Sequence, residues 1–173
     1  MFNQQLRKNL CTALILCHID YCSTAWYNGL TMKRKKQLQV ALNKIARFIL
    51  QLPPRTHVGQ YELDLINFLN ISDRVKQLSL NHAFNIFYGC SPPYLNQFFK
   101  KIADAHSYNT RKRDINFVVP SIKGIAQTTF YYKAIQDWNS LPSDIKSIPS
   151  KQLFKMKVKS HLAHVSYVSE ISV

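Results

Sequence analysis

Apolar side chains recur at helical spacing along most of the chain, and prolines, glycines and capping residues separate the periodic stretches. Little of the chain alternates apolar and polar residues as a half-buried strand does. The sequence therefore predicts a mainly α fold. The expected helices cover residues 3–27, 31–52, 58–68, 72–88, 128–141 and 150–165.

The first two predicted helices are joined by a very short connection. Asn28 and Gly29 end the first helix, Thr31 can cap the second, and Pro53 and Pro54 stop it. A short link between two long amphipathic helices predicts an antiparallel helical hairpin. The expected apolar faces are Leu10, Cys11, Leu14, Ile15, His18, Cys22, Ala25 and Trp26 in the first helix, and Leu38, Ala41, Leu42, Ile45, Ile49 and Leu52 in the second.

The third long helix is apolar on more than one side, which favours a central position. Ser72 is expected to cap this helix, and Gly89 to end it. From 100 to 127 the helical period fails, and residues 115–119 are expected to take part in one short strand pair within about 106–127. The chain thus divides into a helical region (1–99), an irregular basic connector (100–127) and a C-terminal helical tail (128–165), which we expect to form one folded unit.

The composition is that of one compact domain with a strong positive charge. The chain has 173 residues, 46% of them hydrophobic, and a formal net charge of +14. This hydrophobic content argues against disorder, and the charge favours polyanionic partners through counterion release. Nucleic acid is the first candidate and an anionic membrane surface the second, while a solvated basic surface without a partner is the alternative. No apolar stretch reaches the roughly 18 uncharged residues of a membrane-spanning helix, because His18 and Asp20 interrupt the best candidate, and we expect no membrane partner.

The cysteines and histidines suggest no metal site. Cys11, His18 and Cys22 share one predicted helix face, but Cys11 lies about 10 Å from His18 along it, too far for one zinc ion. His18 and Cys22 could share a metal, yet a buried cysteine-lined face is the preferred interpretation. Cys17 and His18 point about 100° apart, so they cannot act as a nucleophile and its base. We therefore predict no catalytic residue, no metal, no cofactor, and reduced thiols in an intracellular protein.

The beginning of the chain has some features of a secretory signal. Arg7 and Lys8 precede an apolar run over 10–17, and Ser23 and Ala25 form a weak cleavage-site pattern. The apolar face nevertheless continues beyond this point, as expected of a helix. We therefore expect a nuclear or cytoplasmic protein and not a secreted one.

The densest group of cations lies at the start of the second predicted helix. It is the run Lys33-Arg34-Lys35-Lys36, which Lys44 and Arg47 continue away from the apolar stripe. The helix dipole disfavours cations in a first turn, so nearby phosphate or a role as a nuclear import signal would explain the run. A solvated helix start is the alternative. We interpret these six residues as a candidate nucleic-acid-binding site.

A second candidate lies in the irregular segment, at Tyr108, Arg111, Lys112 and Arg113. Cations beside an aromatic ring on a loop suit single-stranded nucleic acid, in which bases stack and phosphates pair with cations. Packing of Tyr108 and Asn109 in a turn, with only the charges facing water, is an equally good interpretation.

Two further patterns are interpreted as structural. A row of lysines at intervals of four is expected to be a solvated flank of the last helix: Lys151, Lys155 and Lys159. An aromatic face in the helix before it has core spacing and is expected to be buried rather than to stack bases: Tyr131, Ala134, Ile135 and Trp138.

Three phrases of the sequence resemble one known family. They are Leu16-Cys17-His18-Ile19-Asp20-Tyr21-Cys22-Ser23-Thr24-Ala25-Trp26, His106-Ser107-Tyr108-Asn109-Thr110-Arg111, and Phe130-Tyr131-Tyr132-Lys133-Ala134-Ile135-Gln136-Asp137-Trp138-Asn139-Ser140-Leu141-Pro142. Across residues 7–162, the chain resembles the end of the thumb and the post-polymerase tail of non-LTR, jockey-like retrotransposon reverse transcriptases. The thumb of that family helps to grip the template–primer duplex, so the resemblance implies contact with nucleic acid.

The resemblance implies a C-terminal fragment of an RNA-directed DNA polymerase from a mobile element, with the endonuclease, fingers and catalytic palm missing. The chain has no Asp-Asp dipeptide to hold two metal ions, so we expect no polymerase activity from it. Two alternatives stay open. One is a helical module used by the host, in which the surface once covered by the palm binds another protein. The other is a relic without function.

Overall fold

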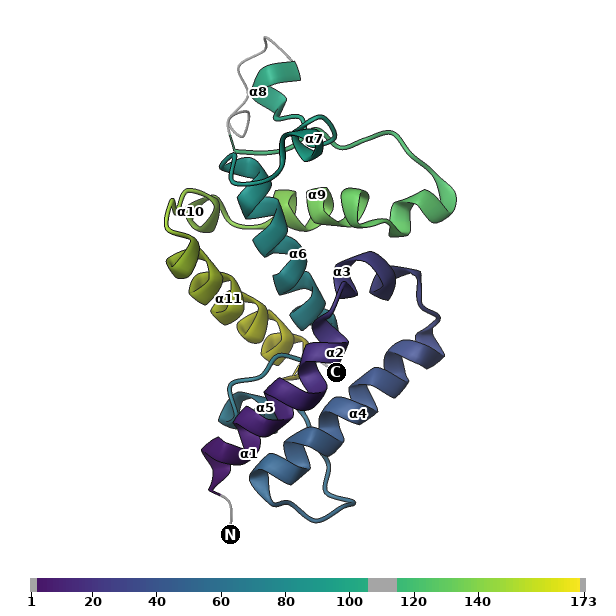
Figure 1. Ribbon diagram of the computed structural model, residues 1–173, viewed down its shortest axis with the longest axis vertical. Coiled ribbons are helices and arrows are strands. Elements are labelled where there is room, and N and C mark those ends of the chain that lie inside the picture. The colour runs from purple at the N-terminus through teal and green to yellow at the C-terminus, as the bar shows by residue number, and fades with distance from the viewer. Residues whose placement is uncertain (1–2, 106–114, 172–173) are drawn as a thin grey trace. The chain divides into compact units, whose positions relative to one another are not determined.

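The computed structural model of the protein describes residues 3–105 and 115–171 (Figure 1). The chain is mainly α-helical, as the sequence predicts. It divides into two compact units, one formed by residues 1–75 and 161–173 and the other by residues 76–160. Both boundaries fall inside long helices, α6 (Ile71–Phe87) and α11 (Lys151–Ile171).

The first unit opens with a helix that changes type and then breaks. Cys22 adopts a left-handed backbone with φ of 50°, which interrupts the helical path. The prediction of one continuous helix over 3–27 is therefore wrong. The elements are α1 (Gln4–Cys11), a π-helical turn (Thr12–Leu16), α2 (Cys17–Asp20), α3 (Ser23–Trp26) and a 3-10 turn (Tyr27–Gly29).

The π-helical turn explains why much of the predicted apolar face of this segment is also wrong. A π turn holds more residues than an α turn, so positions after it are rotated relative to the face that precedes it. Leu10, which precedes the turn, is exposed beside the buried Cys11, so the turn does not account for it. Within the turn, Leu16 is buried, whereas Leu14 and Ile15 are exposed. Hydrophobic spacing assumes a constant helical period and therefore assigned these residues to the wrong sides.

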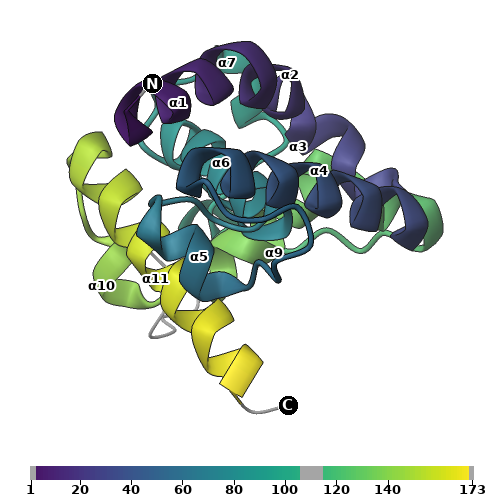
Figure 2. The same cartoon turned by 90° about the horizontal axis from the view of Figure 1, so that it is seen from below.

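The predicted helical hairpin is present in the first unit. α4 (Met32–Leu50) lies beside α1 in both views (Figure 1, Figure 2). The buried Arg7, near the start of α1, donates from Nε to the carbonyl oxygen of Ile49, near the end of α4, at 3.1 Å. The two helices therefore run in opposite directions. Leu42, Ile45 and Ile49 of the predicted α4 stripe are buried in the core of this unit.

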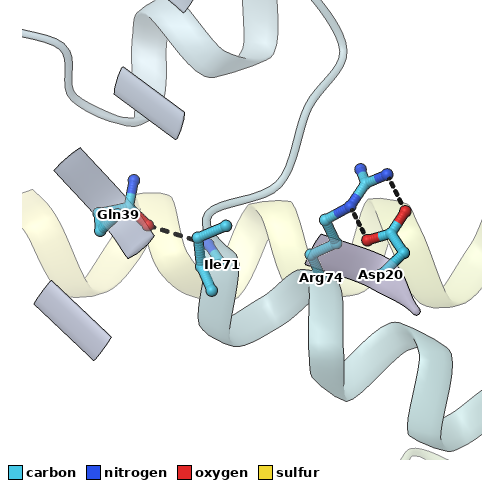
Figure 3. A network of polar contacts seen from close by, with 4 residues as sticks. All are labelled: Asp20, Gln39, Ile71 and Arg74. Atoms are coloured by element: carbon cyan, nitrogen blue, oxygen red, sulfur yellow. Dashed lines mark hydrogen bonds and ion pairs between the residues drawn. The ribbon is translucent and has the colours of Figure 1, made fainter. Parts of the chain in front are cut away.

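Two polar contacts fix the start of α6 within this unit (Figure 3). The backbone N–H of Ile71 donates to Oε1 of Gln39 on α4 at 2.9 Å. Arg74 donates from Nε and Nη2 to the two carboxylate oxygens of Asp20 on α2, at 2.5 and 2.6 Å. Paired, charge-assisted bonds of this kind fix orientation as well as distance. They tie α6 to both arms of the hairpin region.

Side chains at the starts of α6 and α5 cap these two helices. Asn70, rather than the predicted Ser72, caps α6, because its Oδ1 accepts from the backbone N–H of Asp73 at 2.9 Å. The side-chain amide of Asn70 also donates to the Asp73 carboxylate at 2.8 Å. At α5 (Gln60–Leu65), Glu62 accepts from the backbone N–H of Gly59 at 2.8 Å, which completes one half of a capping box.

The second unit contains most of α6, and Gly89 ends this helix in a left-handed conformation (φ 71°), as predicted. The strand interaction expected around 106–127 is an isolated antiparallel bridge between Phe117 and Lys101, so its partner precedes that range. The other elements are α7 (Pro93–Asn96), α8 (Ile102–Ala105), a 3-10 turn (Gly124–Thr128), α9 (Phe130–Ser140), α10 (Ser143–Lys146) and the first half of α11.

Aromatic rings fill the core of the second unit. Trp138 of α9 is fully buried and stacks on Phe87 of α6, with ring centroids 4.9 Å apart. Phe117 and Phe154 pack against the same indole, with centroids at 5.7 and 5.8 Å. Ala134 and Ile135 are buried beside it, so the aromatic face of α9 is a core face, as predicted.

Candidate nucleic-acid interface

The first unit has a long run of sequence with positive charge and no acid. No Asp or Glu occurs between Asp20 and Glu62. α4 lies within this interval and carries six cations, namely Lys33, Arg34, Lys35, Lys36, Lys44 and Arg47. Because no carboxylate offsets these charges locally, α4 is an attractive surface for an anion.

The six cations differ in how far the fold already occupies them. Arg47 donates from Nε to the carbonyl oxygen of Thr56 at 2.7 Å, so it holds the loop that follows α4. Lys35 lies over the ring of Tyr27, 5.0 Å from its centroid, and Arg34 donates to the side chain of its neighbour Gln37 at 3.1 Å. Three of these six cations are exposed and have no ion pair, hydrogen bond or ring contact with the described part of the chain: Lys33, Lys36 and Lys44.

These three lysines line two hollows on one side of α4. One hollow, of about 570 Å³, is lined by Lys33, Lys36, Gln37, Val40, Ala41 and Lys44. The other, of about 730 Å³, is lined by Arg7, Lys44, Arg47, Phe48, Gln51, Leu52 and Pro54. Lys44 belongs to both hollows, so they form one continuous surface along the helix. We call the side chains along it, Lys33, Lys36, Val40, Lys44 and Phe48, the α4 strip.

The start of α4 adds a further positive contribution. Thr31 precedes the helix with an extended backbone, but its side chain makes no capping hydrogen bond. The first turn also contains no acidic residue. Free backbone N–H groups at a helix start attract anions, and here Lys33 and Lys36 lie beside them.

Two apolar members of the α4 strip were not among the residues singled out from the sequence. Val40 is 44% exposed and Phe48 is 53% exposed. The sequence did contain a signal for them, because both positions lie outside the apolar stripe of α4, on the side of the helix that carries Lys44. A hydrophobic residue on a basic helix face is the pattern that would have identified them.

The second predicted site could not be placed. Tyr108, Arg111, Lys112 and Arg113 lie outside the described residues. The lysine row of α11 belongs to the second unit, where Lys151 and Lys155 are exposed and Lys159 is half-buried.

The cysteine and histidine residues near the start of the chain do not converge. Burial raises the pKa of the Cys11 thiol, which therefore stays protonated at neutral pH. Cys17 and Cys22 are exposed. Over residues 3–105 and 115–171, no three His, Cys, Asp or Glu side chains come close enough to hold a metal ion.

The segment from Asp137 to Pro142 stabilises the fold of the second unit through hydrogen bonds of Trp138 and Asn139. Trp138 donates from Nε1 to the carbonyl oxygen of Ile115 at 2.9 Å. The side chain of Asn139 accepts from the backbone N–H of Phe117 at 3.0 Å and donates to its carbonyl oxygen at 2.8 Å. This pair of bonds imitates a neighbouring strand, so the phrase clamps an extended segment.

In comparisons with known proteins, no protein-family model matches the chain, no curated protein matches its sequence, and no solved structure matches its fold. Within the residues that the structure describes, none of the helices combines the length and apolar character needed to cross a membrane.

Proposed function

We propose that this protein binds nucleic acid through its phosphates, with the α4 strip as the contact surface. The observation that carries the proposal is a set of three exposed lysines on one side of an acid-free helix, Lys33, Lys36 and Lys44, none of which has a partner among the described residues. Holding like charges together on one surface is unfavourable unless an anion neutralises them. A polyanion gains further free energy by releasing its counterions on binding.

The resemblance to the thumb end and tail of jockey-like reverse transcriptases supports the same proposal. In this interpretation the chain is a C-terminal fragment of an RNA-directed DNA polymerase, from a mobile element, that keeps a nucleic-acid-binding surface. Its acids are spread along the sequence without an Asp-Asp dipeptide, so a two-metal polymerase mechanism has no carboxylate pair to use. The role that we propose is therefore binding without catalysis. We place this role in the nucleus or the cytoplasm, as expected from the sequence.

A second candidate function is a helical module that binds another protein. The observation in its favour is the row of exposed apolar side chains along α1 and the π-helical turn, Leu6, Leu10, Leu14 and Ile15. Contiguous exposed apolar side chains are typical of protein contacts. This surface carries less of the argument than the α4 strip, because it has no charge or shape feature that identifies a partner.

The test compares two variants that lose the same charge. One replaces Lys33, Lys36 and Lys44 by Gln, and the control replaces the exposed Lys151, Lys155 and Lys157 of α11 by Gln. Binding to a labelled oligonucleotide is measured by fluorescence anisotropy over a series of salt concentrations. Each lost phosphate contact flattens the log–log salt slope by roughly 0.7 to 0.9, so the α4 variant should lose roughly 2 to 3 units of slope.

Circular dichroism checks that both variants keep their helices, as expected for exposed side chains. The control variant should lose less slope than the α4 variant. Equal losses would mean that only net charge matters and would remove the α4 strip from the proposal. A wild-type protein that binds no oligonucleotide at low salt would contradict nucleic-acid binding and leave the protein-binding module as the better candidate.

A further inference from the structure

The hollow at the C-terminal half of α4 contains an exposed aromatic ring between cations. Phe48 is 53% exposed and lines the same hollow as Lys44, Arg47 and Arg7. Lys44 and Phe48 are one helical turn apart, which makes them neighbours on the helix surface. An exposed phenyl ring costs free energy in water, and this ring lies in the hollow rather than in the apolar core.

We propose that this hollow binds an unpaired base of single-stranded nucleic acid, with the base stacked on Phe48 and the adjoining phosphate on Lys44. The inference rests on the proposed nucleic-acid binding and names the strand type that the α4 strip prefers. Stacking of a base on an aromatic side chain beside a basic groove is a general way of holding single strands. The hollow, of about 730 Å³, has room for a base.

Duplex nucleic acid makes poorer use of this surface. The faces of duplex bases are already stacked on each other, so a duplex offers chiefly phosphates and groove edges. Phe48 and Val40 would then remain in contact with water or with charged groups, and neither would gain from binding. A single strand offers base faces and phosphates together, which matches an apolar ring flanked by cations.

The length of the α4 strip also favours a chain of phosphates over a single anion. Lys33 and Lys44 are eleven residues apart, or about 16 Å along the helix axis. Lys36 lies between them, and none of the three has a partner within the described residues. An acidic peptide could meet the same lysines, and it is one of the outcomes that the experiment separates.

The experiment uses the full chain and three fluorescent probes of equal length: an unstructured single-stranded oligonucleotide, the same strand with abasic sugars in place of its nucleotides, and a duplex. The abasic strand keeps the phosphates but has no bases. The wild-type protein should bind the base-bearing strand more tightly than the abasic strand by about 5- to 100-fold, the contribution of one stacked base. Phe48→Ala should remove this preference, and it should weaken binding of the base-bearing strand far more than binding of the abasic strand or the duplex.

Two control variants separate stacking from other effects. Phe48→Trp should keep or increase the preference, because the indole is also a stacking surface. Tyr61→Ala removes another exposed aromatic residue of the first unit and should leave the preference unchanged. Since Phe48 is half exposed, the Ala variant is expected to keep the wild-type circular dichroism spectrum.

Equal wild-type affinity for the base-bearing and abasic strands would overturn this inference while leaving phosphate binding intact. The absence of binding to every probe at low salt would overturn both proposals. Displacement of the base-bearing strand by an equally charged poly-glutamate peptide, with the same loss on Phe48→Ala, would assign the hollow to an acidic peptide and also overturn the inference.

Discussion

The α4 lysines of the first unit and Lys146 of the second unit show two opposite uses of the same kind of side chain. In the first unit, Lys33, Lys36 and Lys44 are exposed on an acid-free helix and have no partner in the described residues. In the second unit, Lys146 is 1% exposed, and its ammonium group donates to Oδ1 of Asn116 at 2.8 Å and to the carbonyl oxygen of Asn139 at 3.0 Å. The first arrangement leaves charge available to a ligand, whereas the second uses charge to hold the fold.

The rings of the two units show the same contrast. Phe48 of the first unit is exposed in a basic hollow, whereas Trp138 of the second unit is buried among other rings. A side chain that a ligand contacts can be removed at little cost to folding, whereas a side chain that fills a core cannot. Variants of the two units should therefore separate binding from stability.

The largest effect on stability is expected from Trp138→Ala. The indole is fully buried, contacts the rings of Phe87, Phe117 and Phe154, and donates to the carbonyl oxygen of Ile115. Its removal leaves a large cavity and an unpaired carbonyl oxygen, so we expect a loss of about 3–5 kcal/mol in the free energy of unfolding. Urea denaturation followed by circular dichroism measures it.

Trp138→Phe is the control for this variant, because it keeps a ring in the core and should lose less stability. Phe48→Ala provides the comparison with the first unit and should change the urea midpoint little. A loss of unfolding free energy for Phe48→Ala as large as that for Trp138→Ala would show that Phe48 is part of a core. It would contradict the proposed difference between Phe48 and Trp138.

A matched pair of lysine variants tests the contrast directly. Lys146→Met keeps the length of the side chain but leaves Asn116 Oδ1 and the Asn139 carbonyl oxygen without this donor, which should cost about 1–3 kcal/mol in the free energy of unfolding. Lys44→Met removes an exposed, partnerless charge and should change that free energy by less than about 0.5 kcal/mol.

Salt-dependent oligonucleotide binding is the second measurement on Lys146→Met and Lys44→Met. In this measurement the order of the effects should reverse, so that Lys44→Met is the more harmful variant. Lys44→Met should weaken binding, while Lys146→Met should leave the affinity of the folded protein unchanged at a temperature well below its unfolding transition. If Lys146→Met were the more harmful to binding, the division of roles between the units would be wrong.

Much of the fold could be predicted because local rules decide it. Thr31 precedes the first turn of α4, Gly89 ends α6, and the spacing of Ala134, Ile135 and Trp138 identifies the core face of α9. Each of these features depends on residues close together in the sequence. The predicted start of α4 was accurate for the same reason, but the helix ends at Leu50, two residues before the predicted Leu52, because Gln51 adopts a left-handed backbone.

The features that were predicted wrongly depend on changes of backbone conformation and on contacts between distant residues. The spacing of nearby apolar residues does not show either of these. The π-helical turn at 12–16 changes the helical period in place, and the left-handed Cys22 interrupts a stretch that contains neither Gly nor Pro. The Asn70 cap competes with Ser72, two residues away, and the choice depends on where the chain arrives from α5. The partner of Phe117 is Lys101, and the sequence gives no direct signal for a pairing across that distance.

Only part of the candidate site could be predicted, because the charges are visible in the sequence but the contacts of each side chain are not. A run such as Lys33 to Lys36 is visible in any sequence, so its charge could be recognised at once. Which of the cations are free depends on tertiary contacts, since Arg47 is held by the Thr56 carbonyl oxygen and Lys35 by the Tyr27 ring. The exposure of Phe48 likewise depends on how α1 and the loop after α4 leave one side of the helix open.

The smallest expected effect concerns His82 of the second unit, where the fold disfavours the protonated, cationic form of the side chain. Partial burial, and secondly the nearby charge of Lys151, lower the pKa of His82 from its ordinary value of 6.5, although much of the side chain remains exposed. The folded state therefore favours neutral His82, and the unfolded state binds a proton more readily. The stability that this residue contributes is present above pH 6.5 and falls as the pH drops below that value, until the folded form is protonated as well.

NMR titration of the His82 imidazole measures this shift directly. The midpoint should lie below 6.5 in the wild-type protein and should move upward in Lys151→Gln, because one of its two causes is removed. Lys155→Gln, one turn further along α11, is the control and should move it less. The unfolding free energy of His82→Asn should also depend less on pH between about 5 and 7 than that of the wild type. A His82 midpoint at or above 6.5 would mean that the second unit accepts this charge, and the contrast between the two units would then hold for lysines and aromatic rings but not for histidine.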